Sequence, residues 1–174
     1  MLFTGPVAHT GRMHVHLKLV LDCPPDAAWR ALRSPSVLTQ VSAPFLTLEP
    51  MGGAGFPERW DAGPHPVRVR ALGGLVDAGT QNIDIAFRTR GAVRILEDHG
   101  GPLTGPLTVV THWRHRMAVT AGATAGTTLF RDRLEFTAGI LTPVVWLGFW
   151  LFWQWRGLAL ARSASGFARR FAAD

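Results

Sequence analysis

Residues 142–171, TPVVWLGFWLFWQWRGLALARSASGFARRF, form the longest stretch of the chain with a helical hydrophobic pattern. Apolar or small side chains recur on one face at alternating steps of three and four residues: Trp146, Trp150, Trp153, Gly157, Leu160, Ala164, Phe167 and Phe171. We expect Thr142 to be the N-cap, with Pro143 at the first helical position, where the missing N–H of proline costs nothing. The pattern predicts one long helix.

The first half of this helix is apolar almost all round, whereas the second half carries Arg156, Arg162, Arg169 and Arg170. We therefore expect the first turns to lie against a large apolar surface. The uninterrupted apolar run lasts about 14 residues and ends at Gln154, short of the roughly 20 that a bilayer span requires. A buried core helix is the favoured interpretation, with an amphipathic membrane-surface segment and a short membrane anchor as alternatives.

The composition favours one domain that folds without covalent cross-links. The chain has 174 residues, and its one cysteine, Cys23, excludes an internal disulfide framework. We expect a single domain over residues 13–174, preceded by a loosely ordered tail over residues 1–12. The sequence does not start with a charged segment followed by an apolar one, so we predict no secretory signal and a cytoplasmic protein.

The formal net charge of +6 comes almost wholly from arginine, because Lys18 is the only lysine. Arginines stand two residues apart along strand-like segments, as do Arg114 and Arg116 or Arg131 and Arg133. Such alternation is typical of the solvated outer face of a sheet. We interpret it in this way rather than as a phosphate-tracking patch, and we predict no nucleic-acid partner.

The order of the expected elements indicates an α+β fold. Residues 13–22 alternate as a half-buried strand, and short helices are expected over 26–32 and 35–41. Strands separated by glycine- and proline-rich turns are then expected over 45–50, 57–62, 66–72, 80–89, 92–98, 107–119 and 127–137. This order predicts a curved antiparallel sheet of about seven strands, with helices on one face.

Two parts of the chain carry a family resemblance. They are LDCPPDAAWRAL, which ends the first strand and begins the first helix, and RDRLEFTAGILTPVVWLGFWLFWQWR, which joins the last strand to the long helix. The chain resembles the START-type helix-grip superfamily (SRPBCC), which includes polyketide cyclase/dehydrase-like proteins. The resemblance implies a sheet wrapped around the C-terminal helix, with an elongated cavity between them. It also implies either binding of lipids, sterols or polyketides, or cyclisation and dehydration chemistry.

His115 and Asp132 are the two polar side chains that strand alternation directs toward the helix, because their neighbours on that face are apolar. If the connection around residues 123–124 closes symmetrically, His115 lies directly opposite Asp132, Met117 opposite Phe130, and Trp113 opposite Leu134. An imidazole held by a buried carboxylate can act as a general base or orient a ligand. Alternatively, the two side chains only satisfy each other's hydrogen-bonding groups within a core.

The remaining candidate site residues are one amide and several tryptophans. Gln81 alternates inward and is suited to hydrogen bonding with a ligand carbonyl or hydroxyl. Trp60 is a candidate for the cavity mouth, and the apolar wall is expected to include Trp113, Trp146, Trp150 and Trp153. These helix tryptophans, with Phe149, either line the cavity or fill much of it. His14 and His16 lack a further ligand at metal-binding spacing, so we predict no metal and no cofactor.

Three functions are compatible with this sequence. The first is binding of a small or medium apolar ligand, lipid-like or polyketide-like, between sheet and helix. The second is a polyketide cyclase/aromatase or dehydratase-type enzyme in which Asp132 orients His115 as the base and Gln81 polarises a carbonyl. The third is a pocketless interaction module that docks on a partner or an anionic membrane. We expect no stable membrane insertion, and an aromatic patch of Phe149, Phe152 and Trp155 suggests a homodimer.

Overall fold

The computed structural model describes residues 11–171, so most of the tail expected over residues 1–12 lies outside the described residues. The elements, in chain order, are β1 (Met13–Leu21), α1 (Pro25–Leu32), α2 (Pro35–Ser42), β2 (Leu46–Pro50), β3 (Gly63–Ala71), β4 (Val76–Arg90), β5 (Val93–Asp98), β6 (Gly101–Thr104), the 3-10 turn η1 (Pro106–Val109), β7 (His112–Ala121), β8 (Thr128–Thr137), the 3-10 turn η2 (Gly139–Leu141) and α3 (Thr142–Arg170).

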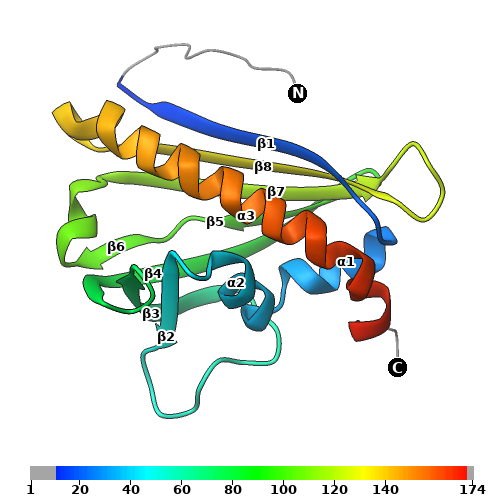
Figure 1. The fold of residues 1–174 in the computed structure, drawn as a ribbon, viewed down its shortest axis with the longest axis horizontal. Coiled ribbons are helices and arrows are strands. Elements are labelled where there is room, and N and C mark those ends of the chain that lie inside the picture. The colour runs from blue at the N-terminus through cyan, green and yellow to red at the C-terminus, as the bar shows by residue number, and fades with distance from the viewer. Residues whose placement is uncertain (1–10, 172–174) are drawn as a thin grey trace.

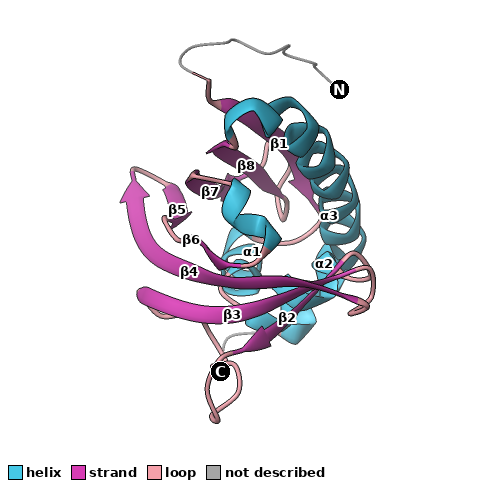
Figure 2. Ribbon diagram, turned by 90° about the vertical axis from the view of Figure 1, so that its left-hand side faces the viewer, coloured by secondary structure: helices cyan, strands magenta, loops and turns pink. Residues whose placement is uncertain are grey.

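The strands form one antiparallel sheet in the order β1-β8-β7-β5-β4-β3-β2, with β6 paired beside the first part of β4. The sheet curves around α3, and α1 and α2 lie between the sheet and the second half of that helix (Figures 1 and 2). This arrangement confirms the predicted helix-grip architecture. No helix among residues 11–171 is long and apolar enough to cross a membrane.

The second half of α3 packs closely on β1. Leu160, Ala164 and Phe167 are buried, as the stripe of apolar residues predicts. Gly157 marks the closest approach, because a Cβ atom added there would lie 2.9 Å from Leu17 Cδ1. A larger residue at this position would push the helix away from the sheet.

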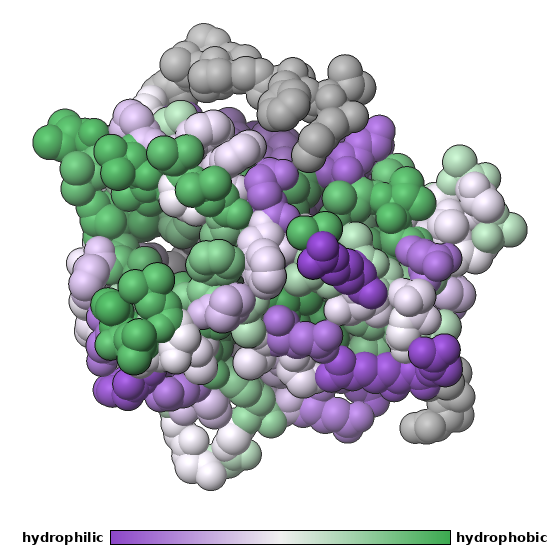
Figure 3. All heavy atoms as spheres, viewed as in Figure 1, coloured by the Kyte–Doolittle hydropathy of each residue, from purple (hydrophilic) through white to green (hydrophobic). Residues whose placement is uncertain are grey.

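The first turns of α3 lie against an apolar surface on one side only. Trp146, Phe149 and Trp150 pack on a buried apolar cluster, as predicted. The opposite side, with Val144, Leu147 and Leu151, is exposed, and hydrophobic residues gather at this end of the molecule in Figure 3. Thr142 is the first helical residue rather than a cap of the helix. Its hydroxyl donates to the Gly139 carbonyl at 2.6 Å and accepts from the Ala138 N–H at 2.9 Å.

Two of the predicted strand assignments are also wrong. Residues 57–62 form no strand, because the N–H of Trp60 donates to the Arg33 carbonyl at the end of α1, 2.7 Å away, rather than to a neighbouring strand. β6 was not predicted, because its first residues, Gly101 and Pro102, resemble a turn. In addition, the first part of the strand predicted over 107–119 is η1, so β7 begins only at His112.

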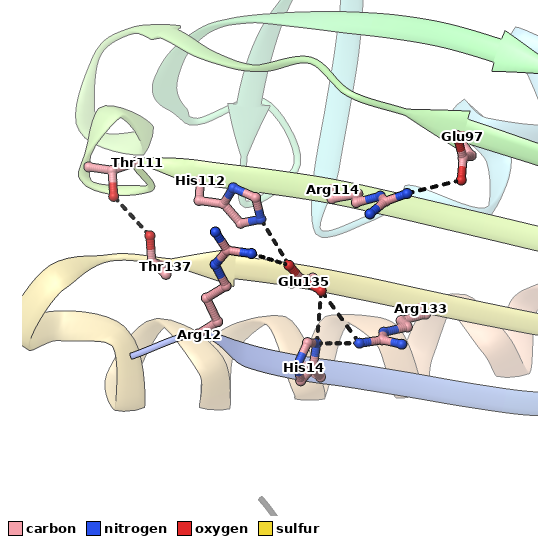
Figure 4. A network of polar contacts seen from close by, with 9 residues as sticks. All are labelled: Arg12, His14, Glu97, Thr111, His112, Arg114, Arg133, Glu135 and Thr137. Atoms are coloured by element: carbon pink, nitrogen blue, oxygen red, sulfur yellow. Dashed lines mark hydrogen bonds and ion pairs between the residues drawn. The ribbon is translucent and has the colours of Figure 1, made fainter. Parts of the chain in front are cut away.

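The outer face of the sheet carries a polar network centred on Glu135 (Figure 4). Arg12 Nη1 and His112 Nε2 each lie 3.1 Å from its carboxylate, with Arg133 Nη2 at 3.4 Å and His14 Nδ1 at 3.7 Å. Burial raises the pKa of Glu135, but the hydrogen bond from His112 and the surrounding cations outweigh burial and hold that pKa below its ordinary value. His14 is therefore one member of a polar network on the outer face.

A second acidic residue, Glu97, organises the arginines of the central strands. Arg88 Nε lies 3.0 Å from its carboxylate, Arg114 Nη2 lies at 3.5 Å, and Arg116 Nε lies at 3.9 Å. The arginines themselves are partly exposed, while Glu97 is covered by their side chains. The arginine pairs thus lie on the outer face, as their alternation predicts.

Candidate functional site

A cavity of about 560 Å³ lies between the concave face of the sheet and α3. Its wall is mainly aliphatic and aromatic and comes from both ends of the chain: β2 to β5, β7, the three α-helices and η1. Few polar side chains reach it, and they are Ser42, Gln81, Asp98, His115 and Arg156. Alternation along the strands accounts for this composition, because each strand directs every second side chain toward the helix.

Asp132 lies behind the inner wall of the cavity, on β8, and accepts hydrogen bonds from two other elements. His115 Nε2, on β7, lies 2.7 Å from Asp132 Oδ1, and Trp153 Nε1, on α3, donates to the same oxygen at 3.0 Å. The guanidinium of Arg156 lies 3.6 Å from Asp132 Oδ2. His115 and Asp132 are both buried, as strand alternation predicts. We call these four residues the Asp132 cluster.

The environment keeps Asp132 ionised. Burial alone raises the pKa of this carboxyl group, but the charges of His115 and Arg156 and the hydrogen bonds from His115 and Trp153 outweigh burial and hold the pKa below its ordinary value. An ionised carboxylate has no proton to donate, so His115 must donate from Nε2. When His115 is neutral, its charge no longer contributes, and Arg156 and the hydrogen bonds from His115 and Trp153 still favour the ionised form of Asp132. The free lone pair of the neutral ring is on Nδ1, which has no hydrogen-bond partner among residues 11–171.

Arg156 is a site residue that the sequence analysis missed. Only 8% of its side chain is exposed, its Nη2 donates to Met117 Sδ at 3.0 Å, and its guanidinium carbon lies 5.4 Å from the centre of the Trp153 ring. By position it is the first of the charged residues in the second half of the helix. A usable signal existed, because Arg156 stands three residues after Trp153 and directly before Gly157, beside the buried stripe.

Asp98, at the end of β5, is a second buried carboxylate that was not predicted. Its Oδ2 accepts from Trp113 Nε1 at 3.0 Å, and its Oδ1 accepts from the backbone N–H groups of Asp84 and Gly100, each at 2.9 Å. These three donors compensate its burial. Asp98 therefore fixes the Trp113 ring and the start of β6 at the cavity wall.

The tryptophans predicted for the wall fall into two groups. Trp60, Trp113 and Trp153 line the cavity, as does Gln81. The other group, Trp146 and Trp150, does not line it: the two rings stack with centroids 6.4 Å apart, and Trp146 Nε1 donates to the His14 carbonyl on β1 at 2.8 Å. Because these two indoles lie against β1, they leave the cavity open.

The open cavity contradicts the alternative of a pocketless interaction module. The aromatic patch expected from Phe149, Phe152 and Trp155 is also wrong. Phe149 and Phe152 line the cavity, while Trp155 packs edge-on against Phe45 and donates to the Ala43 carbonyl at 2.7 Å. The three rings therefore do not share one surface patch, and the homodimer stays a prediction.

No protein-family model matches the sequence, and no curated protein matches it. Solved structures do match the fold. A hypothetical protein from Helicobacter pylori superposes with a TM-score of 0.64 at 10% sequence identity, over 87% of each chain. The Zhui aromatase/cyclase from Streptomyces sp. R1128 superposes with a TM-score of 0.52 at 16% identity, over 93% of this chain and 96% of that one.

A third match is norcoclaurine synthase from Thalictrum flavum, in complex with dopamine and hydroxybenzaldehyde. Its TM-score is 0.58 at 13% identity, over 100% of this chain and 99% of that one. Together with the architecture, these likenesses show that the chain has the helix-grip fold. At such identities they establish the fold alone.

Proposed function

We propose that this chain binds a small or medium apolar molecule, lipid-like or polyketide-like, in the cavity between sheet and α3. The observation that carries the proposal is the cavity itself, whose volume of about 560 Å³ falls within the roughly 300–1,000 Å³ typical of ligand pockets. Its apolar wall would supply most of the binding free energy by removing apolar ligand surface from water.

The polar groups favour a ligand with a neutral oxygen function at its inner end. Arg156 forms one hydrogen bond within residues 11–171, to Met117 Sδ, so other N–H groups of its guanidinium can donate to a ligand carbonyl. Neutral His115 can accept from a ligand hydroxyl at Nδ1. A ligand carboxylate is disfavoured, because the buried carboxylates of Asp98 and Asp132 would repel it.

A cavity-filling substitution tests the proposal. Ile83→Trp places an indole where an aliphatic side chain lines the wall, whereas Val20→Trp adds the same side chain at an exposed position on β1. We expect wild type and Val20→Trp to take up an apolar dye such as Nile red, and Ile83→Trp to lose uptake while retaining its circular dichroism spectrum. Equal uptake by all three proteins would contradict binding in this cavity.

A second candidate function is catalysis of the cyclase or dehydratase type. The observation that favours it is the geometry of His115, whose Nε2 is held by the Asp132 carboxylate while Nδ1 has a lone pair when the ring is neutral. His115 Nδ1 would take a proton from the carbon next to a ligand carbonyl, and the electron pair left on that carbon would form an enolate. Arg156 or Gln81 would stabilise the enolate oxygen. His115 Nδ1–H would then return its proton to the β-hydroxyl group, which leaves as water as the enolate collapses to the unsaturated carbonyl.

His115→Ala distinguishes the two functions once a ligand is known. Unchanged affinity with lost turnover supports an enzyme, whereas weakened binding with no turnover in the wild type supports a binding module. His112→Ala is the matched control, because His112 lies on the same strand but contacts Glu135 on the outer face. It should change neither quantity.

A further inference from the structure

The most exposed apolar side chains of the described residues gather at one end of the molecule. Ile140 is 96% exposed, Leu75 is 87% exposed and Val144 is 71% exposed, and they come from η2, the β3–β4 turn and α3. Figure 3 shows hydrophobic residues over this end, at the left of the view. We define the apolar rim as these three residues together with Leu72, Leu103 and Leu147, which are also exposed.

The apolar rim lies beside the wall of the cavity. Leu72 is 62% exposed and also lines the cavity, so it belongs to both surfaces. On α3, Val145 and Gly148 line the cavity directly beside the rim residues Val144 and Leu147. The turn η1 contributes Leu107 to the cavity wall, next to Leu103 in β6. A ligand that enters here therefore passes between rim side chains.

The clustering of the rim residues indicates more than ordinary surface exposure. Single exposed apolar residues are ordinary on a protein surface, but a cluster drawn from several separate segments indicates a contact surface. The rim residues are also spread over the tips of turns and the start of a helix (Figure 1). Protruding tips of this kind can enter the interface of a bilayer, where each apolar side chain leaves water.

The net charge of the whole chain, rather than cations beside the rim, favours an anionic partner. Residues 99–111 and 136–155, which include η1, η2 and the first turns of α3, carry neither acidic residues nor Arg or Lys, and Asp77 beside Leu75 is paired with Arg68. The formal net charge of the chain is +6. An anionic lipid surface attracts such a protein, whereas two copies of the chain repel each other electrostatically.

We infer that the apolar rim docks reversibly on the surface of an anionic phospholipid bilayer, with this side of the cavity facing the lipid. The rim side chains enter the interfacial region, and no part of α3 spans the bilayer. If the proposed function holds, docking lets an apolar ligand pass between bilayer and cavity without crossing water. The docking itself does not depend on that function and can be tested without any ligand.

Vesicle flotation tests this inference. The vesicles contain either phosphatidylcholine alone or phosphatidylcholine mixed with phosphatidylglycerol. The test variant is the double substitution Ile140→Asp and Leu75→Asp at the two most exposed rim positions, and the control is Val20→Asp, at an exposed site on β1 away from the rim. We expect wild type and control to float with the mixed vesicles at low salt, and the rim variant to bind at least about tenfold more weakly.

Equal flotation of the rim variant and the wild type would overturn the inference, as would failure of the wild type to bind the mixed vesicles. Light scattering identifies the competing occupant. A wild-type dimer that the rim substitutions convert to a monomer, without vesicle binding, would assign the rim to a second copy of this chain. Vesicle flotation tests docking, whereas dye uptake by Ile83→Trp tests ligand binding in the cavity. Failure of docking and failure of the proposed function are therefore distinguishable.

Discussion

His115 Nε2 lies 2.7 Å from Asp132 Oδ1, although the two residues are not opposite each other in the β7–β8 ladder. His115 pairs with Leu134, and Asp132 pairs with Met117, so the contact is diagonal. The diagonal leaves Asp132 within reach of Trp153 and Arg156 on α3. One buried carboxylate thereby links two strands and the long helix at the inner wall of the cavity.

The first prediction concerns the stability that this carboxylate contributes. Asp132→Asn removes the charge that compensates buried Arg156, and we expect the free energy of unfolding to fall by about 3 kcal/mol. Asp77→Asn is the control, because Asp77 forms an exposed ion pair with Arg68 at 3.7 Å and should contribute less than about 1 kcal/mol. Urea denaturation measures both values. Similar losses in the two variants would contradict a special role for the Asp132 cluster.

The second prediction is a pH dependence specific to Asp132. Its pKa in the folded chain is lower than its ordinary value of 3.8, so folding favours the ionised form. The stability from this group is therefore fully present above pH 3.8 and is lost as the pH falls through the lower folded pKa. We expect the difference in unfolding free energy between wild type and Asp132→Asn to shrink below pH 3.8.

His14 on β1 adds an acid-dependent loss that both proteins share. Burial, followed by the charge of Arg133, lowers the pKa of His14 below its ordinary value of 6.5, and Asp132 does not contribute to this shift. Protonation then favours the unfolded chain, so stability declines as the pH falls below 6.5. Subtracting the two urea curves at each pH removes this shared loss. A difference that stays constant down to pH 2 would show that Asp132 keeps its ordinary pKa.

The third prediction tests the contact between α3 and β1. Gly157→Leu forces a side chain toward Leu17 and should lower the free energy of unfolding by about 1–3 kcal/mol or more. Gly166→Leu is the matched control in the same helix, because an added Cβ atom at Gly166 meets no atom within 4 Å. Leucine favours helix over glycine, so this control should be neutral or stabilising. Thermal melting of both variants decides the matter, and equal melting temperatures would contradict the close approach at Gly157.

The fourth prediction concerns access to the cavity. Gly148 lines the cavity on α3, and a Cβ atom added there meets no atom within 4 Å, so a side chain can begin at this position without a clash. We expect Gly148→Trp to slow uptake of Nile red several-fold while the melting temperature stays close to that of wild type. Stopped-flow fluorescence measures the rate, with Gly166→Trp as the control. Equal rates in the two variants would show that the ligand enters elsewhere.

The sequence predicted the inward direction of His115 and Asp132 but not their register. The connection between β7 and β8 closes one position further along than a symmetric turn at residues 123–124, because the Gly122 N–H bonds the Thr127 carbonyl and the Thr127 N–H bonds the Thr124 carbonyl. The change moves each cross-strand partner by two residues, which keeps every side chain on its predicted face. Strand alternation therefore predicts the face on which a side chain lies, whereas the assumed turn geometry does not predict the cross-strand register.

Other parts of the site depend on contacts between distant segments, which local patterns do not record. The buried state of Arg156 depends on Asp132 and Met117, which lie on strands far from it in sequence. Trp60 reaches the cavity from a loop rather than a strand, because its backbone bonds the end of α1. The exposed side of the first turns of α3 likewise contradicts the simple rule that an apolar stretch must be covered.

The central claim is that the cavity holds an apolar molecule, and native mass spectrometry tests it most directly. The protein is purified from its own host, and its mass is compared under gentle and denaturing conditions. We predict release of a reproducible apolar molecule that carries a neutral carbonyl or hydroxyl group. Detection of unliganded protein alone, together with no uptake of any compound from a lipid extract of the same host, would contradict the claim.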